Sequence, residues 1–151
     1  VKRGTILFIV SQGAALLWAP VIGPLIDRWN RVTALTVSMG LAALGYLSLV
    51  LIGNPLEPLS MIFFVLLGIG QISAFLGSQS LIGQEAPREA RGSVMGAFNI
   101  SGAVGILLIT MAGGRLFDGM SPKAPFLIVG AINLAVMAAG VLLKLKEEKK
   151  G

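Results

Sequence analysis

The sequence of 151 residues contains no cysteine, no histidine and only seven acidic residues. Without these residues the chain has no disulfide, no thiol nucleophile, no usual zinc site and no histidine to act as a general base. The carboxylates lie between or beyond the apolar stretches, and no nucleophile has a histidine partner. We therefore predict that the chain is not an enzyme and has no catalytic residue, metal or cofactor.

Charged residues are also scarce. They make up 13% of the chain, whereas apolar types make up 55%, and the mean hydropathy is +0.86. Ordinary soluble domains carry far more charge. The net charge of +5 could suggest nucleic acid, but the lysines and arginines form no basic stripe along one helix. We predict an integral membrane protein that contacts a lipid bilayer and no nucleic acid.

Five stretches of the chain carry no charged residue, and they cover residues 5–26, 32–53, 59–82, 92–114 and 124–143. A helix rises about 1.5 Å per residue, so roughly 20 residues cross the hydrocarbon of a bilayer. Lipid offers the backbone no hydrogen-bond partners, which requires each stretch to be a continuous helix. The sequence therefore predicts an all-α fold of five transmembrane helices joined by short loops.

The basic residues are divided unequally between the two faces that such helices define. One face has Arg28, Arg31, Arg88, Arg91, Lys144, Lys146, Lys149 and Lys150, and the other has Lys2, Arg3, Arg115 and Lys123. Loops rich in Lys and Arg stay on the cytoplasmic side of a membrane. We therefore expect the first face, with the tail 144–151, to be cytoplasmic in a multi-pass protein of the cell (inner or plasma) membrane.

The loop after the first stretch reads Gly23-Pro24-Leu25-Ile26-Asp27-Arg28-Trp29-Asn30-Arg31. It resembles the signature loop Gly-x-x-x-Asp-Arg-x-Gly-Arg of the major facilitator superfamily of secondary transporters. Asn30 replaces a glycine, and asparagine would still permit a tight turn with a left-handed backbone.

This resemblance implies a cytoplasmic latch. Asp27 would face the N-terminus of a helix in the opposite domain, where the helix dipole favours an anion, while the arginines bind carboxylates or carbonyls. The latch residues would be Gly23, Asp27, Arg28 and Arg31. The alternative is that the charges only orient the flanking helices.

The fourth stretch has glycines at the spacing of the family's antiporter motif, namely Gly96, Gly105, Gly113 and Gly114. Ile109 and Thr110 stand where the family has a Gly-Pro pair, so the proline that would kink the helix is missing. We therefore predict that these glycines allow close helix packing rather than antiport.

Two features favour the C-terminal half of such a transporter. In the N-terminal half, the helix that matches 59–82 usually carries a membrane-embedded arginine, and this stretch has none. The charged end of the chain is similar to the tail that follows a twelfth helix. We expect residues 1–151 to be helices eight to twelve of a six-helix bundle, with the missing N-terminal half as partner. A complete protein of five helices is the alternative, against which Val1 and the odd helix count argue.

Uncharged polar residues inside the stretches mark the candidate binding site. The family architecture implies that the first, third and fourth helices face a central cavity and that the second and fifth are peripheral. Gln71, Phe75 and Gln79 share one face of the third helix, where amides and an aromatic ring could bind a small molecule. Gln12 and Asn99 are further candidates from the first and fourth helices. Hydrogen bonding between helices is the alternative for each glutamine.

The five stretches contain no ionisable residue apart from the phenol of Tyr46. Coupling to protons would therefore need groups in other helices. Asn133, in the fifth stretch, is expected to be structural. We predict transport of a small molecule by alternating access, with drug or metabolite efflux as one form. The alternative is a non-transporting scaffold, assembly factor or receptor that keeps the transporter fold.

Overall fold

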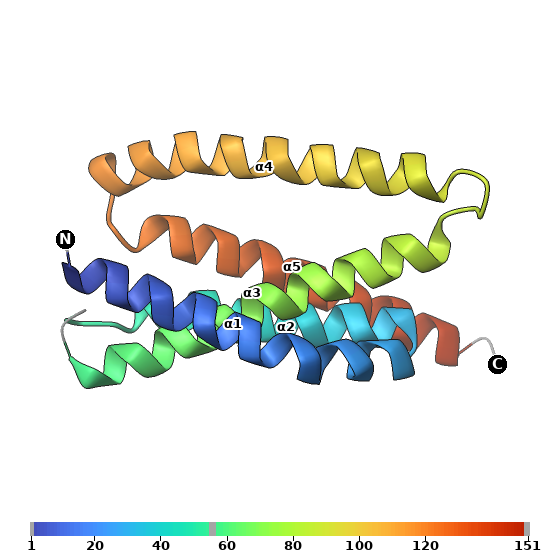
Figure 1. The fold of residues 1–151 in the computed structure, drawn as a ribbon, viewed down its shortest axis with the longest axis horizontal. Helices are drawn as coiled ribbons and strands as arrows, with labels where there is room; N and C mark the ends of the chain where they lie inside the picture. Colours follow the sequence, from blue (N-terminus) through green and yellow to red (C-terminus); the bar gives the residue numbers. More distant parts are fainter. Residues whose placement is uncertain (1, 55–56, 150–151) are drawn as a thin grey trace.

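The computed structural model describes residues 2–54 and 57–149, which form helices and no strand. The helices are α1 (Lys2–Arg28), α2 (Arg31–Val50), α3 (Pro58–Glu85), α4 (Arg91–Gly119) and α5 (Ala124–Glu148). Each of the five is long and apolar enough to cross a membrane. The prediction of an all-α protein with five spanning helices is thus confirmed for the described residues (Figure 1).

Most helix ends lie a few residues from the ends of the charge-free stretches, and the ends of α2 and α5 are two examples. α2 stops at Val50, and the Leu51 N–H bonds to the Ser48 carbonyl at 3.1 Å as the chain turns. The turn precedes Gly53 and Asn54, residues that favour turns. α5 continues through Glu148, so the expected tail 144–151 is helical for most of its length. Residues 150 and 151 of that tail, and the expected cytoplasmic charge of Lys150, lie outside the described residues.

α2 lies at the centre of the packing. It packs against α3 and against α5, while α1 packs mainly against α3. A buried cluster of Ile22, Ile26 and Ala34 joins the end of α1 to the start of α2, and Trp18, Trp29, Leu41 and Leu76 pack around it. This cluster fixes the position of the loop between α1 and α2.

Small residues bring the backbones of these helices together. A Cβ built on Gly70 of α3 would lie 2.6 Å from the carbonyl oxygen of Leu41 on α2. A Cβ on Gly68 would collide with the carbonyl oxygen of Ser11 on α1. Such close contact requires glycine, and in membranes it replaces the hydrophobic force that drives packing in water.

α4 has a different environment. It contacts α3 and α5 only sparsely, and Figure 1 shows it set apart from the other helices along its middle. No residue of α4 whose side chain is described is buried. One long apolar helix therefore has no extended packing partner within the described chain.

Candidate functional site

A cavity of about 410 Å³ opens between the helices and is lined by residues from all five of them. The lining residues are Gln12 and Ala15 of α1, Tyr46 of α2, Gln71, Ile72, Ala74 and Phe75 of α3, Ile106 of α4, and Val129 and Asn133 of α5. The described lining carries no formal charge at neutral pH. The cavity can therefore offer hydrogen bonds and apolar contacts, and no ion pair from these residues.

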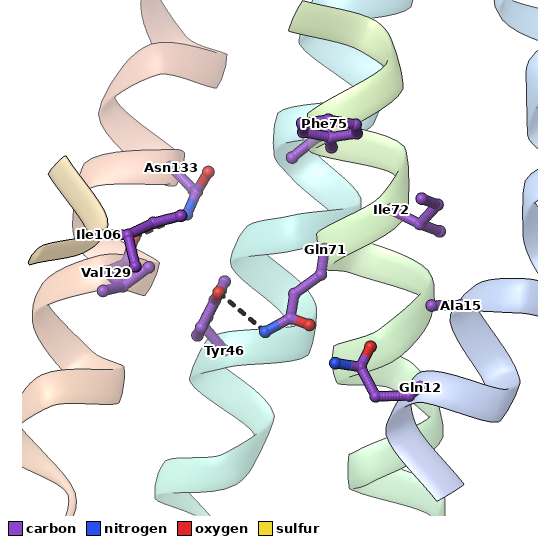
Figure 2. Close-up of a pocket in the computed structure, with 10 residues that line it drawn as sticks. Gln12, Ala15, Tyr46, Gln71, Ile72, Phe75, Ile106, Val129 and Asn133 are labelled. Atoms are coloured by element: carbon purple, nitrogen blue, oxygen red, sulfur yellow. Dashed lines mark hydrogen bonds between the residues drawn. The ribbon is translucent and has the colours of Figure 1, made fainter. Parts of the chain in front are cut away.

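One hydrogen bond orders the polar part of the lining. The Gln71 Nε2 donates to the Tyr46 Oη at 3.2 Å. Figure 2 shows the Gln71 side chain between Tyr46 of α2 and Gln12 of α1. Because Nε2 is engaged, the Gln71 carbonyl oxygen is held as an acceptor, while the Tyr46 hydroxyl keeps its own hydrogen to donate.

Three of the five predicted binding residues meet in this cavity. Gln12, Gln71 and Phe75 line it, and the Phe75 side chain is 52% exposed and therefore accessible. Gln79 and Asn99 do not line it. Gln79 is seven residues after Ile72 and Asn99 seven before Ile106, so each lies on a lining face but about two turns nearer the α3–α4 loop.

Three lining residues come from helices that were expected to be peripheral. Tyr46 belongs to α2, and Val129 and Asn133 belong to α5, so the expectation that these helices lie away from the cavity is wrong for these positions. α2 reaches the cavity because it packs between α3 and α5. The Asn133 Nδ2 donates to the Val129 carbonyl at 2.8 Å, the local bond expected of a structural asparagine.

Tyr46 is a residue of the cavity lining that the sequence analysis did not single out. It is the single tyrosine of the chain, and a hydroxyl at this depth needs a partner. Its pairing with Gln71 follows from the rotation of α2 against α3, which no local pattern encodes.

The loop between α1 and α2 turns without a left-handed backbone at Asn30. Asn30 has φ −57° and ψ 137°, and no described residue has a positive φ. Asn30 therefore does not adopt the left-handed backbone that its residue type would permit. Instead, its Oδ1 accepts a 3.0 Å hydrogen bond from the Val32 N–H and caps α2, a role that asparagine fills well and glycine fills without a side chain.

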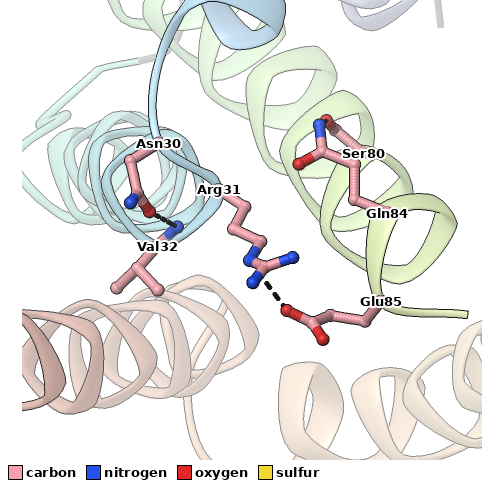
Figure 3. A network of polar contacts seen from close by, with 6 residues as sticks. All are labelled: Asn30, Arg31, Val32, Ser80, Gln84 and Glu85. Atoms are coloured by element: carbon pink, nitrogen blue, oxygen red, sulfur yellow. Dashed lines mark hydrogen bonds and ion pairs between the residues drawn. The ribbon is translucent and has the colours of Figure 1, made fainter.

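Arg31 has a partner within the same chain. Its Nε lies 2.8 Å from the Glu85 Oε1 at the end of α3, as Figure 3 shows. Asp27 and Arg28 are exposed and form no ion pair among the described residues. Gly23 lies inside α1, and a Cβ built there would meet nothing within 4 Å. The loop thus presents one paired and two unpaired charges at this end of the bundle.

The glycines of α4 make no close contact within the described chain. A Cβ built at Gly96, Gly105, Gly113 or Gly114 would meet nothing within 4 Å. The close glycine contacts lie instead on α2, α3 and α5. That the α4 glycines allow close packing stays a prediction, and their partner would be a helix outside the described residues.

The described residues contain no group of three or more His, Cys, Asp or Glu side chains that could hold a metal ion. The arrangement therefore points to binding by hydrogen bonds and shape.

Comparisons with known proteins agree with this architecture. The family model described as Major Facilitator Superfamily matches residues 4–151. The magnetosome protein MamH of Paramagnetospirillum magneticum is 36% identical over 149 residues, which are 99% of this chain and 35% of that protein.

Two further relatives are named magnetosome protein MamZ. The protein from P. magneticum is 32% identical over 123 residues, and the one from Magnetospirillum gryphiswaldense is 33% identical over 125 residues. In each case the match covers 82% of this chain and 19% of the relative. The chain thus spans about a third or less of the curated relatives it matches. No solved structure matches.

Proposed function

The chain belongs to the major facilitator superfamily, and on that premise we propose that it forms part of the C-terminal half of a secondary transporter, as helices eight to twelve. Proteins of this family are transporters and not enzymes, so the prediction of no enzymatic activity is confirmed. Membership and five apolar helices also make the chain a multi-pass membrane protein. The finer proposal is alternating access of one small-molecule site to the two sides of a membrane.

One observation carries the substrate proposal. Uncharged hydrogen-bonding groups of Gln12, Tyr46 and Gln71 converge with the Phe75 ring on one cavity. This mixture suits a small molecule with hydroxyl or amide groups and one apolar face. Neither the direction of transport nor a coupling ion enters the proposal.

The isolation of α4 supports a partner for this chain. A helix in which no described side chain is buried, and in which most apolar side chains are exposed, is covered by lipid or by another helix. Its glycines offer no packing contact here, although they permit close approach. We propose that helices from the rest of the transporter, including its N-terminal half, cover part of α4.

Because helices outside this chain are proposed to cover α4, the cavity has a second candidate role, which is contact with one of those helices. Gln12, Gln71 and Tyr46 could hydrogen-bond a further helix of the same protein rather than a substrate. The two roles differ in their effect on stability, because a lost contact between helices lowers the melting temperature while a lost contact to substrate changes affinity.

The test uses the full-length protein in proteoliposomes. Counterflow with a panel of radiolabelled sugars, amino acids and organic acids identifies a substrate, and the Gln71→Leu variant is then compared with wild type. We expect Gln71→Leu to weaken binding, and to lower the melting temperature no more than Tyr46→Phe, which loses the same hydrogen bond between α2 and α3. The matched control is Gln84→Leu, since Gln84 is exposed, bonds only to Ser80 within α3 and lies outside the cavity. A lower melting temperature with unchanged affinity would assign Gln71 to helix packing.

The alternative function is a non-transporting scaffold, assembly factor or receptor with the same fold. The described lining of the cavity carries no charged residue, and many coupled transporters use such a group at depth, so this alternative gains support unless helices outside this chain supply one. This alternative would be supported if no compound of the panel gave counterflow and if a partner protein co-purified with the full-length protein.

We propose the cell inner (plasma) membrane as the location, with the C-terminus cytoplasmic. The relatives are named magnetosome proteins, which makes a magnetosome membrane the second candidate. Membrane fractionation of the full-length protein distinguishes the two locations, and a C-terminal reporter that is active only in the cytoplasm tests the orientation.

A further inference from the structure

A second cavity lies at the membrane face opposite the Arg31–Glu85 pair. Its volume is about 400 Å³, and its described lining comprises Leu49, Ile52, Gly53, Phe64, Ser121, Pro122, Lys123 and Phe126. α2 ends and α5 begins at this face, which is the left end of Figure 1. The cavity therefore sits where the bundle meets the boundary between hydrocarbon and headgroups.

The walls of this cavity are mainly hydrocarbon. Leu49 is buried, and Ile52, Phe64 and Phe126 are partly exposed around the space. In a spanning bundle such apolar surface is stable when it contacts an acyl chain, and aromatic side chains are common at this depth.

The rim has the opposite character, and its charge is positive. Lys123 lines the cavity, is exposed, and forms no ion pair among the described residues. It directly precedes α5, whose first turn has no acidic residue and whose N-cap makes no side-chain hydrogen bond. The ammonium group and the positive end of the α5 dipole therefore favour an anion at the same place.

Hydrocarbon walls beneath a cationic rim match the chemistry of a phospholipid. A phosphodiester would sit against Lys123 and the first turn of α5, and an acyl chain would run down along Phe64 and Phe126. The bilayer supplies this molecule next to the cavity at high local concentration. A soluble anion would use the rim alone and leave the apolar walls uncovered.

We propose that this cavity is a binding site for an anionic membrane phospholipid, held by its phosphate at Lys123 and by an acyl chain between α2, α3 and α5. The bound lipid would join the end of the α2–α3 pair to the start of α5. The proposal does not depend on transport, and it applies equally if the protein is a scaffold.

The test measures lipid retained by the full-length protein. Protein from nanodiscs of phosphatidylcholine with one tenth phosphatidylglycerol is released into mild detergent, and bound phosphatidylglycerol is counted by native mass spectrometry. Lys123→Gln should reduce retention about fivefold, the change expected when one cation facing anionic lipid is removed. Phe126→Ala should also reduce it, because the acyl chain loses a wall.

Lys146→Gln is the matched control, since Lys146 is an exposed lysine near the other end of α5 and lines neither cavity. The Lys146→Gln variant should retain as much phosphatidylglycerol as wild type. Equal retention in Lys123→Gln and wild type overturns the proposal. Displacement of the lipid by millimolar inorganic phosphate, with Phe126→Ala unaffected, also overturns it and indicates a site for free anions. Melting temperatures of all variants show whether the fold is intact.

Discussion

The Gln71 amide of α3 donates a hydrogen bond to the Tyr46 phenol of α2 across 3.2 Å, at the wall of the cavity that all five helices line. The bond links two helices that also pack extensively. It has a chemical consequence as well, because it orients an amide whose remaining acceptor is available to a ligand. Tyr46 is therefore a positioning residue for Gln71 in the proposed site.

Tyr46→Phe should weaken substrate binding by about fivefold, the loss expected for one hydrogen bond of about 1 kcal/mol. The ring and its packing remain, so the melting temperature should fall only by the loss of this one hydrogen bond between α2 and α3. Equilibrium binding of the substrate found by counterflow measures the effect. In the double variant with Gln71→Leu, the two losses should not add, because both remove the same arrangement. Ser48→Ala on the same helix is the control, and full additivity would contradict the positioning role.

Arg31→Gln and Glu85→Gln should each alter the rate of transport while leaving stability nearly unchanged. The two side chains are 46% and 56% exposed, and exposed ion pairs contribute only about 0–1 kcal/mol. The pair joins the latch loop to the end of α3, so it should affect the rate at which the helical bundle changes conformation. Initial transport rates in proteoliposomes measure the effect.

The charge-reversed pair, Arg31→Glu with Glu85→Arg, should restore part of the rate that either single reversal removes. Arg88→Gln, in the exposed loop after α3, is the matched control. Wild-type rates in both neutralised variants would show that the pair has no role in the conformational cycle.

Asp27→Ala in the complete protein should slow transport with less effect on substrate binding. Asp27 is exposed and has no ion-pair partner among the described residues, which leaves it available to a helix of the opposite domain. Rate and affinity are measured separately, and Asp118→Ala at the other membrane face is the control. Unaltered transport would refute the latch.

Gly70→Ala should lower the free energy of unfolding by about 1–3 kcal/mol, the usual cost of overpacking. The added Cβ would lie 2.6 Å from the Leu41 carbonyl oxygen, and a backbone atom cannot move aside cheaply. Gly83→Ala on the same helix is the control, because a Cβ there meets nothing within 4 Å and alanine favours helix by about 1 kcal/mol. Thermal unfolding in detergent should separate the two variants, and equal melting temperatures would contradict the packing described for α2 and α3.

Several features of the site follow from local pattern. The spacing of Gln71 and Phe75 put them on one helix face, and both line the cavity. The same spacing could not say how far along the helix the cavity extends, so Gln79 lies outside it. Depth depends on where α4 and α1 cross α3, and this is set by contacts between helices.

Side-chain partners on different helices could not be predicted from the sequence for the same reason. The charge of Arg31 was visible, but not its pairing with Glu85, which lies 54 positions along the chain and on another helix. Asn30 shows a local limit, because asparagine serves left-handed turns and helix caps equally well. Only the backbone of the loop decided that it caps α2.

The sequence by itself determined the five helices, because charge-free stretches long enough to cross a bilayer can satisfy their backbone only within each helix. It also indicated the family, through the resemblance of the loop that ends α1, and the family model over residues 4–151 confirmed it. Only the tertiary structure decided that α2 lies centrally, that Tyr46 reaches the cavity and that α4 contacts the other described helices only sparsely. These depend on close approaches such as that of Gly70 to Leu41, where the shape of two surfaces, rather than the hydropathy of either, sets rotation and depth.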